Sequence, residues 1–562
     1  MNPAGTERTA SNPSAPSQPR MPGTPRAQPD APGSRHAHPQ WSAVLFKIAP
    51  VAFPAAVMAV LGAWGLARDS ALSNDEAATR IAAQLSLSQL YHLLRHIDAV
   101  HGLYYLFMQG WIGLGASPAV LRVPSVLVMI AAVALTSVLG IKLTRSGWVG
   151  FFAGLIMAIT PAISFYAQTA RSYAFVITCV IGATLVLVTV LRAESSGAPT
   201  VRRWWVTYAA LIALSAYLNE MALLVLAAHG VTVLLARYRP AVLRHWVIAV
   251  ICGVAAVGPL LLISATQHAD VSWIPKPTLG SVGVLFHDYF GARYIVPAGI
   301  VLCVIIALLP VRGQHFRPAE SADATTGTAG ASASEQPWWR RPGVSLPSVA
   351  LPLLVVPALL LIVESIVGKS LFIDRYVLYG EPGAALLASA GLYRIGLWLG
   401  SATGRRWLIW TPGLLACVAL LPLQIGTQRY FRTPESRLFD LTGPAAFIGA
   451  HARPHDGVLF FDTLFRKDRL LYPHEYGNTD DFGQALSPLQ SHDFRGTDRP
   501  FAALRPLILQ QRRIWVVGFK PSASLRTAAL RQQSRVLMGN FTLVEQRHFR
   551  GIDVTLWLRR SR

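Results

Sequence analysis

The sequence predicts a polytopic α-helical membrane protein, with about eleven transmembrane helices and a small C-terminal extracytoplasmic α/β domain. Of its 562 residues, 52% are hydrophobic and only 14% are charged, whereas soluble globular chains carry about 25% charged residues. Eleven apolar segments approach the length of about 20 residues that crosses a bilayer. After Leu423 the composition becomes that of a soluble domain. The chain is too apolar to be a series of soluble domains and too long to be a single-span anchor.

The first 43 residues form a polar tail ahead of the first apolar segment. The tail is rich in Pro, Ser, Ala and Gly and shows no apolar periodicity, so we expect it to be disordered. It is too long and too polar for a secretory signal, and the apolar run behind it is long enough to span a membrane. We therefore predict a cytoplasmic tail over residues 1–43, followed by a retained helix.

The predicted spans form a membrane domain over residues 44–423. In chain order they are Val44–Leu66, Ala119–Ile141, Trp148–Ile163, Tyr173–Leu191, Trp204–Leu218, Met221–Leu235, Trp246–Ser264, Ile295–Val311, Val349–Val367, Tyr376–Leu399 and Trp407–Leu423. A loop over residues 312–346 contains a run of Ser, Ala, Thr and Gly, which is a flexible-linker composition. This loop divides the spans into a group of eight and a group of three.

The distribution of Lys and Arg predicts the orientation in the membrane. With the tail inside, the inner loops hold fifteen basic residues, while the outer loops hold nine basic and nine acidic residues. Because basic residues are enriched in cytoplasmic loops, we expect the N-terminus in the cytoplasm and the C-terminus outside the plasma membrane. Most of the net charge of +22 therefore lies on the cytoplasmic side and does not indicate a nucleic-acid-binding surface.

Residues 424–562 form the predicted outer domain. Its elements are strands at Gly457–Phe461 and Ile514–Phe519, a helix at Ser522–Leu537, and a hairpin of Phe541–His548 and Ile552–Leu558 around Arg550-Gly551. The domain carries 21 basic and 12 acidic residues, so we expect anionic lipid headgroups or cell-envelope polymer as partners. All four cysteines fall inside predicted spans, which indicates neither a disulfide framework nor a cysteine metal site.

The first outer loop, over residues 67–118, is the longest of the outer loops and is rich in polar residues. Asp75 and Glu76 are adjacent carboxylates just after the first span. In one interpretation Ser73 or Asn74 caps a helix, and the helix dipole stabilises both carboxylates in its first turn. In the other, a carboxylate at the membrane surface acts as a general base. The spacing alone leaves both open.

Histidines in the same loop allow a second pair of interpretations. His92 and His96 are four residues apart, a spacing that places them on one helical face, and Asp98 and His101 follow closely. Metal ligands show such spacings, but histidines beside an aromatic belt are common at membrane interfaces, and we favour the second interpretation. The next outer segment, residues 164–173, contains no carboxylate.

Two arginines lie on the same predicted side of the membrane. Arg171 is close to Tyr166 and Tyr173, and Arg375 directly precedes Tyr376 at the start of a span. Arginine and tyrosine are common interfacial anchors, but the planar fork of arginine also suits a phosphate. Together with the carboxylate loop, these residues favour a site for a substrate whose phosphate lies at the membrane surface.

At these residues the sequence resembles the membrane-embedded (GT-C) glycosyltransferases that use polyprenyl-phosphate sugars. It is most similar to the glycosyltransferase family 39 mannosyltransferases, relatives of protein O-mannosyltransferases and of the lipid A aminoarabinose transferase. Four motifs carry the resemblance, which extends over residues 44–424: Asp75-Glu76, the stretch from His96 to Tyr105, Arg171-Ser172-Tyr173, and Asp374-Arg375-Tyr376. Many relatives have Pro-Pro where this chain has His101-Gly102.

The resemblance implies roles for these residues. Asp75 corresponds to the catalytic base, Glu76 to the carboxylate that orients the site, and the reaction inverts the sugar's anomeric centre. The residues expected to bind the donor and its phosphate are Asp98, His101, Tyr105, Arg171, Tyr173, Arg375 and Tyr376. Relatives that use a metal take acidic ligands from two outer loops. Because residues 164–173 offer none, we expect no metal and no other cofactor.

The function implied by this resemblance is transfer of a sugar, with mannose the expected one, from a polyprenyl-phosphate donor. The acceptor is a protein, a glycolipid or a cell-wall glycan on the outer face. A transporter or flippase for a lipid-linked sugar, or a scaffold that binds the cell envelope, is the alternative. A transport pathway predicts ionisable residues deep in several spans. We place only Glu364 inside a span, near its outer end, which favours the enzyme.

Overall fold

The computed structural model describes residues 40–67, 71–195, 202–237, 239–267, 274–291, 294–309, 343–519 and 527–560. Most of the predicted tail and of the loop over residues 312–346 therefore lies outside the described residues. The chain forms two compact units, residues 1–46 and residues 47–562. The features described below belong to the second unit. The exception is residues 40–46, which begin the first helix and belong to the first unit.

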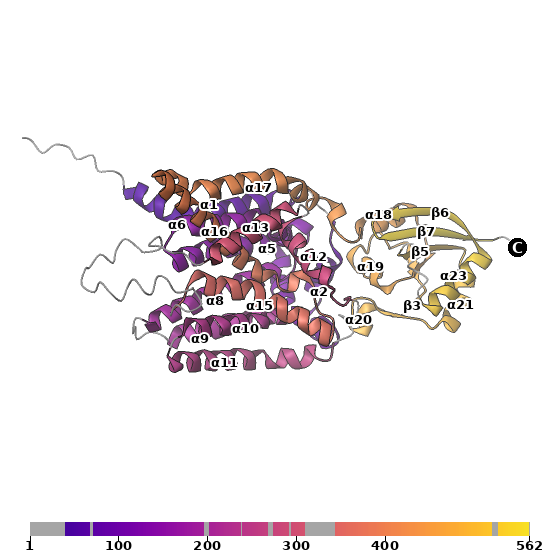
Figure 1. The fold of residues 1–562 in the computed structure, drawn as a ribbon. Helices are drawn as coiled ribbons and strands as arrows, with labels where there is room; N and C mark the ends of the chain where they lie inside the picture. The colour runs from indigo at the N-terminus through magenta and orange to yellow at the C-terminus, as the bar shows by residue number, and fades with distance from the viewer. Residues whose placement is uncertain are drawn as a thin grey trace, which may run out of the picture. The chain divides into compact units, whose positions relative to one another are not determined.

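Long helices make up the larger part of the molecule and run side by side (Figure 1). They are α1 (Gln40–Ala63), α5 (Pro118–Thr144), α6 (Gly147–Ile159), α7 (Pro161–Ala167), α8 (Tyr173–Ser195), α9 (Arg202–Leu218), α10 (Val225–Ala236), α11 (Pro240–Ser264), α13 (Ile295–Leu308), α15 (Leu346–Val367), α16 (Glu381–Thr403) and α17 (Thr411–Tyr430). Each predicted span falls on one of these helices, or on two where the helix is broken.

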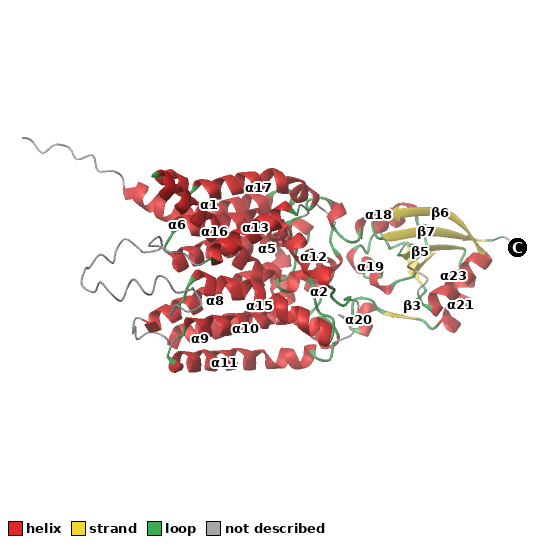
Figure 2. Cartoon of the chain, in the orientation of Figure 1, coloured by secondary structure: helices red, strands yellow, loops and turns green. Residues whose placement is uncertain are grey.

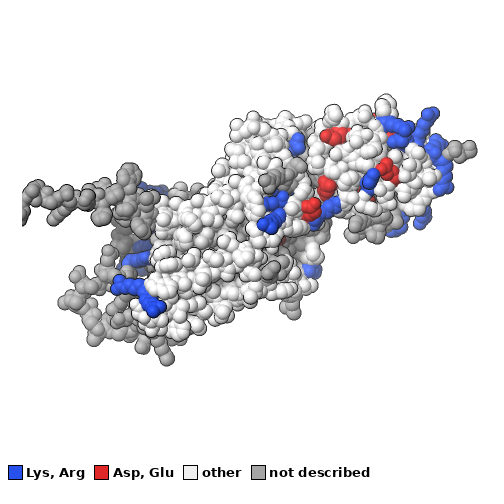
Figure 3. All heavy atoms as spheres, turned by 90° about the horizontal axis from the view of Figure 1, so that it is seen from above, with Lys and Arg blue, Asp and Glu red and all other residues white. Residues whose placement is uncertain are grey.

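Five helices among the described residues are long and apolar enough to cross a membrane, or six if one bent pair counts as a single span. The chain is thus a multi-pass membrane protein, but the structure does not confirm the number eleven. Helices α9, α10 and α13 have 17, 12 and 14 residues, fewer than the roughly 20 that span a bilayer. Figure 3 shows a broad face of the helical part of the molecule that is largely free of charged side chains, as a lipid-facing surface requires.

The bent pair corrects one expectation about charge inside the spans. Helices α6 and α7 meet at an angle of 66° beside Thr160, whose hydroxyl donates to Glu381 Oε1 at 3.2 Å. Glu381 is fully buried and belongs to the apolar segment Leu378–Thr403, so Glu364 is not the only acidic residue inside a span. Glu381 is the first residue of α16, and it therefore also lies near the end of its helix.

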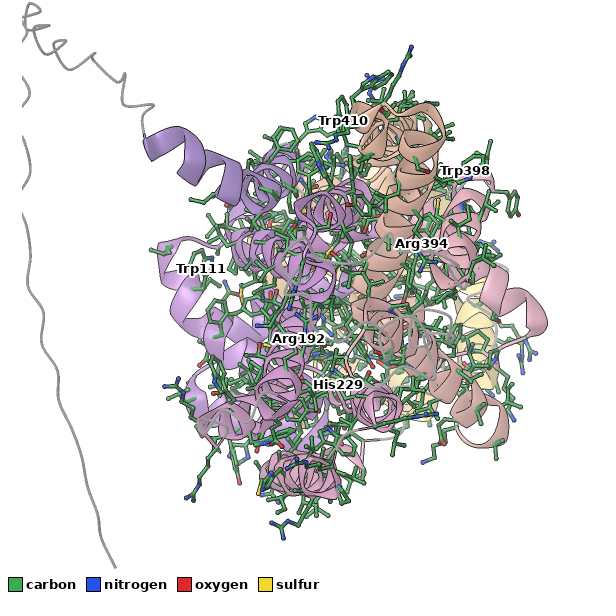
Figure 4. The ribbon with its side chains drawn as sticks, turned by 60° about the vertical axis from the view of Figure 1, so that its left-hand side comes forward. Trp111, Arg192, His229, Arg394, Trp398 and Trp410 are labelled. Atoms are coloured by element: carbon green, nitrogen blue, oxygen red, sulfur yellow. The ribbon has the colours of Figure 1, made fainter. Side chains whose placement is uncertain are left out.

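At the end of the bundle away from the sheet, arginines close helix C-termini. Arg192 donates to the carbonyl oxygen of Lys142, at the end of α5. Arg394 donates to the carbonyls of Ile306 and Leu309, both at 2.8 Å, at the end of α13. Figure 4 labels both arginines in a view towards this end. These contacts satisfy carbonyl groups that a helix C-terminus leaves without an intrahelical partner.

Short helices lie between the long helices and the sheet (Figure 1). The first outer loop contains α2 (Asn74–Gln84), α3 (Leu87–His96), η1 (Ala99–His101) and α4 (Gly102–Trp111), and later loops add α12 (Leu279–Phe290) and η5 (Asp374–Tyr376). The residues singled out in the sequence lie in or beside these short elements. The interface between the bundle and the sheet domain is therefore where the functional groups meet.

The C-terminal domain is built on a five-stranded sheet, and Figure 2 shows the strands gathered there. The order is β2 (Thr479–Asp481), β1 (Asp456–Phe460), β5 (Arg513–Gly518), β7 (Ile552–Arg559) and β6 (Phe541–Phe549), and the domain adds β3 (Gln484–Leu486), β4 (Thr497–Asp498), α18 (Thr442–His451), α19 (Asp468–Leu471), α20 (Pro488–Ser491), α21 (Phe501–Gln510) and α23 (Ala528–Asn540). Strand β1 is parallel to both β2 and β5, and β7 is antiparallel to β5 and β6.

The predicted elements of this domain are confirmed with small shifts in their bounds. Both buried strands are present as β1 and β5, and the hairpin is β6–β7, whose turn places Gly551 at a φ of +72°. Glycine adopts this left-handed conformation without steric cost. The predicted helix is α23, which begins at Ala528 with Thr527 as its N-cap. The expected start at Ser522 lies outside the described residues.

Candidate active site

A capping box starts α2 and decides where its two carboxylates point. Ser73 Oγ accepts from the backbone N–H of Glu76 at 3.3 Å, and Glu76 Oε2 accepts from the N–H of Ser73 at 2.9 Å. This reciprocal pair satisfies two of the unbonded donors at a helix start. The capping interpretation is therefore confirmed for Glu76. Asp75, one residue earlier, makes no part of the cap.

Glu76 is fully buried, and its carboxylate accepts four hydrogen bonds. Besides the bond from Ser73, Oε1 accepts from Arg122 Nε at 2.7 Å and from the Ala170 backbone at 3.0 Å, while Oε2 accepts from Arg122 Nη2 at 3.0 Å. Arg437 adds an ion pair at 3.8 Å. We call these five residues the Glu76 cluster. Burial raises the pKa of Glu76, but Arg122 and Arg437 lower it much further, so this carboxylate stays ionised and ties α2 to α5 and to the segment after α17.

Asp75 points into different surroundings. Its side chain is 39% exposed, and Oδ2 lies 3.8 Å from Arg375 Nη2. It also interacts electrostatically with Arg171, Lys467 and His101. We call these five residues the Asp75 cluster. Removal from bulk water raises the pKa of Asp75, but the three cations outweigh this effect and hold the pKa below its usual value. Asp75 is therefore an ionised carboxylate within reach of solvent.

Arg171 is held beside Asp75 by a chain of hydrogen bonds. Its Nη1 donates to the Tyr105 hydroxyl at 2.9 Å, and that hydroxyl donates to Asp98 Oδ2 at 2.6 Å. Asp98 has a φ of 58°, a conformation that Asp tolerates better than most residues. The His101 ring lies 6.0 Å from the Tyr105 ring. The second predicted motif and Arg171 thus form one connected unit.

Arg375 closes the other side of the cluster. Its guanidinium carbon lies 6.0 Å from the centre of the Tyr173 ring and 5.8 Å from that of Tyr376, distances at which cation–π attraction operates. Tyr173 in turn contacts the ring of Tyr166 at 5.2 Å. Contacts and electrostatic interactions therefore link eight of the nine predicted site residues, although they come from four motifs spread over about 300 residues of sequence. The ninth, Glu76, belongs to the separate Glu76 cluster.

Three polar atoms around Asp75 lack a hydrogen-bond partner in the described part of the protein. Arg171 Nε, Arg375 Nε and His101 Nδ1 are buried and have no hydrogen-bond partner among the described residues. Leaving a buried donor unpaired costs about 1–3 kcal/mol. Burial and the nearby Arg171 lower the pKa of His101 to about 3, so its ring is neutral at neutral pH. The two arginine N–H groups can bind an anionic oxygen such as that of a phosphate.

Three site residues were missed in the sequence. Lys467, from the C-terminal domain, is 3% exposed and donates from Nζ to the carbonyl oxygen of Asn74 at 3.1 Å. Arg122 and Arg437, the partners of Glu76, are equally well buried. The sequence held one usable signal: Lys467 closely follows the predicted strand Gly457–Phe461, and ligand-binding groups gather at the carboxyl ends of parallel strands.

The histidines of α3 take part in a contact between the two domains. His96 Nδ1 lies 2.8 Å from the carbonyl oxygen of His92. Both rings stack on His492 of the C-terminal domain, with ring centres 4.9 and 5.4 Å apart. In the described part of the chain, no three His, Cys, Asp or Glu residues are arranged to hold a metal ion. The metal-free expectation itself stays a prediction.

No protein-family model matches this chain, and no curated protein matches it either. Among solved structures, it is similar to ArnT from Cupriavidus metallidurans bound to undecaprenyl phosphate, with a TM-score of 0.54 and 14% identity over 92% of this chain and 98% of that one. The same protein in the apo state gives 0.53 and 12% over the same shares. The arabinofuranosyltransferase AftD from Mycobacteria gives 0.45 and 14%, over 93% of this chain and 40% of that one.

The similarity to ArnT covers nearly the whole of both chains, and at these identities it establishes the fold. This chain therefore has the fold of ArnT, which agrees with the fold that the resemblance implied. The class defined by fold and site is a multi-pass membrane protein of this fold, with a cluster of cations around a half-exposed carboxylate.

Proposed function

We propose that this chain is an integral-membrane glycosyltransferase, which moves a sugar from a polyprenyl-phosphate donor to an acceptor on the outer face of the membrane. The observation that carries the proposal is the Asp75 cluster. It places an ionised, half-exposed carboxylate beside two arginines that keep unpaired N–H donors. A base for an acceptor hydroxyl and a receptor for a phosphate thus lie side by side.

Each group of the cluster has a part in the proposed reaction. Asp75 takes the proton from the acceptor hydroxyl while the hydroxyl oxygen forms a bond to the anomeric carbon of the sugar. The bond from that carbon to the phosphate oxygen breaks, and the polyprenyl phosphate leaves with the electron pair. Attack opposite the leaving group inverts the anomeric centre. Arg171 and Arg375 stabilise the negative charge that develops on the departing phosphate.

The similarity to ArnT supports the choice of donor, because that protein was solved bound to undecaprenyl phosphate. A donor of this kind keeps its lipid in the bilayer and its sugar at the surface, where the short helices of the first outer loop lie. Mannose is the proposed sugar, and a protein, a glycolipid or a cell-wall glycan the proposed acceptor. We further propose that the N-terminus is cytoplasmic, that the site is extracytoplasmic, and that neither a metal nor nucleic acid takes part.

A donor screen tests this proposal. Purified full-length protein is incubated with polyprenyl-phosphate mannose, other polyprenyl-phosphate sugars and a membrane acceptor extract, and transferred sugar and released polyprenyl phosphate are measured. We expect transfer from one donor by the wild type and none above background by Asp75→Asn. Asp480→Asn, at an exposed carboxylate of the C-terminal domain, serves as the matched control.

Two results would contradict the proposal. If no donor gives transfer while the wild type moves a lipid-linked sugar across vesicle membranes, the protein is a transporter. If Asp75→Asn transfers as fast as the wild type, Asp75 is not the base. The same assay in excess chelator should give unchanged rates, and loss of activity that a divalent ion restores would overturn the metal-free expectation.

A further inference from the structure

The C-terminal domain reaches the Asp75 cluster through the segment that follows β1. Strand β1 lies between β2 and β5 and is parallel to both. The carboxyl end of β1 therefore lies at a topological switch point of the sheet. In open parallel sheets, ligand-binding groups gather outside the carboxyl ends of strands at such a point. Here the segment after β1 leads through Arg466 and Lys467 into α19, which packs against α2.

Arg466 fixes the position of this segment. Its guanidinium is 1% exposed, with Nε donating to Asp481 Oδ2 at 2.8 Å and Nη2 to Asp498 Oδ1 at 2.5 Å. Nη1 donates to the carbonyl oxygen of Arg495 at 2.9 Å. Because three donors of one planar group are engaged at once, the backbone that carries Lys467 has little freedom. Lys467 is therefore preorganised towards α2.

The surroundings of Lys467 are unfavourable for a lysine side chain. It is nearly fully buried and bonds to the first turn of α2, where the helix dipole disfavours a cation. Burial lowers the pKa of Lys467, and the negative charges of Asp468, Asp75 and Asp98 partly restore it, while Arg495 opposes them. The cost of burying this cation is offset in part by the carboxylates of Asp75 and Asp98, whereas burial raises the pKa of the neighbouring Asp468 well above its usual value.

We propose that Lys467 is a positioning residue of the active site: the C-terminal domain supplies its ammonium group, which holds the backbone of Asn74 and keeps Asp75 ionised and oriented. Docking of the C-terminal domain then completes the site, in addition to any part that the domain plays in binding the acceptor. This inference rests on the proposed function for its activity readouts, but not for its structural one.

Replacement by a neutral and by a charged side chain separates positioning from packing. The variants are Lys467→Met and Lys467→Arg in the full-length protein, with Arg505→Met, at an exposed position of α21, as the matched control. We expect Lys467→Met to lower kcat/KM by roughly 10–100-fold, the cost of a misplaced reacting group. Lys467→Arg should stay within about threefold of the wild type, because arginine keeps the charge and the donors.

The pH dependence of kcat/KM gives a second test, because a lysine that only fills space would not change it. The titratable groups that face Asp75 are His101, Arg171, Tyr173, Arg375, Tyr376 and Lys467. Loss of the Lys467 charge raises the pKa of Asp75, so the acid limb of kcat/KM should shift to higher pH in Lys467→Met. In the wild type, deprotonation of Lys467 should give an alkaline limb below the ordinary lysine value of about 10.4. Lys467→Arg should move that limb upwards.

The outcomes separate this inference from the proposed function. Lys467→Met with unchanged kcat/KM and unchanged limbs overturns the inference, and so do equal losses of activity and stability in both variants. If the wild type transfers no sugar, the proposed function fails. The inference about Lys467 is then tested by the rate of backbone amide hydrogen exchange in α2, residues 74–84. Faster exchange in Lys467→Met, but not in Lys467→Arg, supports it, and equal exchange in all three proteins overturns it.

Discussion

Asp75 and Glu76 are neighbours in the sequence, and the structure gives their carboxylates different surroundings. Glu76 is fully buried and accepts four hydrogen bonds from groups of the protein. Asp75 is 39% exposed, and its nearest ion pair spans 3.8 Å. Both face arginines, and both have pKa values below their usual range. The difference is in the unused acceptor capacity: Glu76 has none left for a substrate, whereas Asp75 retains enough to take a proton.

Replacing Asp75 gives the largest expected effect in this comparison. Asp75→Asn should lower kcat/KM for transfer by about 10²–10⁴-fold, the usual contribution of a general base. Its unfolding midpoint in detergent should change little, because a half-exposed ion pair contributes only about 0–1 kcal/mol. Steady-state kinetics and thermal unfolding of the same preparation check both statements. A variant that stays active but unfolds early would reverse the roles assigned to the two carboxylates.

Replacing Glu76 should have the opposite pattern. Glu76→Gln keeps the shape but leaves Arg122 and Arg437 without their counter-charge, and breaking a buried ion pair costs about 3–5 kcal/mol. We expect a lower free energy of unfolding, measured by denaturant titration in detergent, and a loss of activity that follows the loss of folded protein. Glu435→Gln, at an exposed glutamate, is the matched control. A stable but inactive Glu76→Gln protein would place Glu76 among the catalytic residues.

Arg375 of the Asp75 cluster and Arg95, an arginine outside both clusters, offer a third, smaller contrast. Arg375→Gln removes an unpaired donor of the Asp75 cluster, and a hydrogen bond to a charged group contributes about 1.5–3 kcal/mol. The dissociation constant for undecaprenyl phosphate, measured by fluorescence titration, should therefore rise by roughly 10–150-fold. Arg95→Gln, an exposed position in the same outer loop, should leave it unchanged. Equal affinity in Arg375→Gln and the wild type would remove Arg375 from the phosphate site.

The smallest expected effect is that of mild acid. The pKa of Asp75 lies below its ordinary value of 3.8, and that of His101 is about 3. A carboxyl group with a depressed pKa stays ionised until the pH falls through that pKa, so neither group changes its protonation between pH 7 and pH 5. We expect kcat/KM to be flat over this window. An acid limb near pH 6 would assign the base to a group other than Asp75.

The sequence predicted those parts of the molecule that depend on local pattern or on a family motif. Apolar segments marked the helices, because a lipid-facing or buried helix needs a long apolar run. The motifs brought together residues such as Asp98 and Arg375, which are linked only in the fold. The partners of Glu76 could not be predicted, because pairing between distant segments leaves no periodicity. For Lys467 the sequence offered only its position after the predicted strand Gly457–Phe461. Glu381, by contrast, could have been recognised from the sequence, because it lies inside the predicted span Tyr376–Leu399.

The bond from Lys467 to Asn74 also sets an order of events during synthesis. The two residues are 393 positions apart, and a ribosome that adds about 5–20 residues per second needs roughly 20–80 s to make the intervening chain. During that interval every helix of the bundle after α1 is made, while the Asp75 cluster still lacks Lys467. A nascent or truncated chain that reaches the membrane without its last domain would therefore hold an Asp75 cluster without the ammonium group of Lys467.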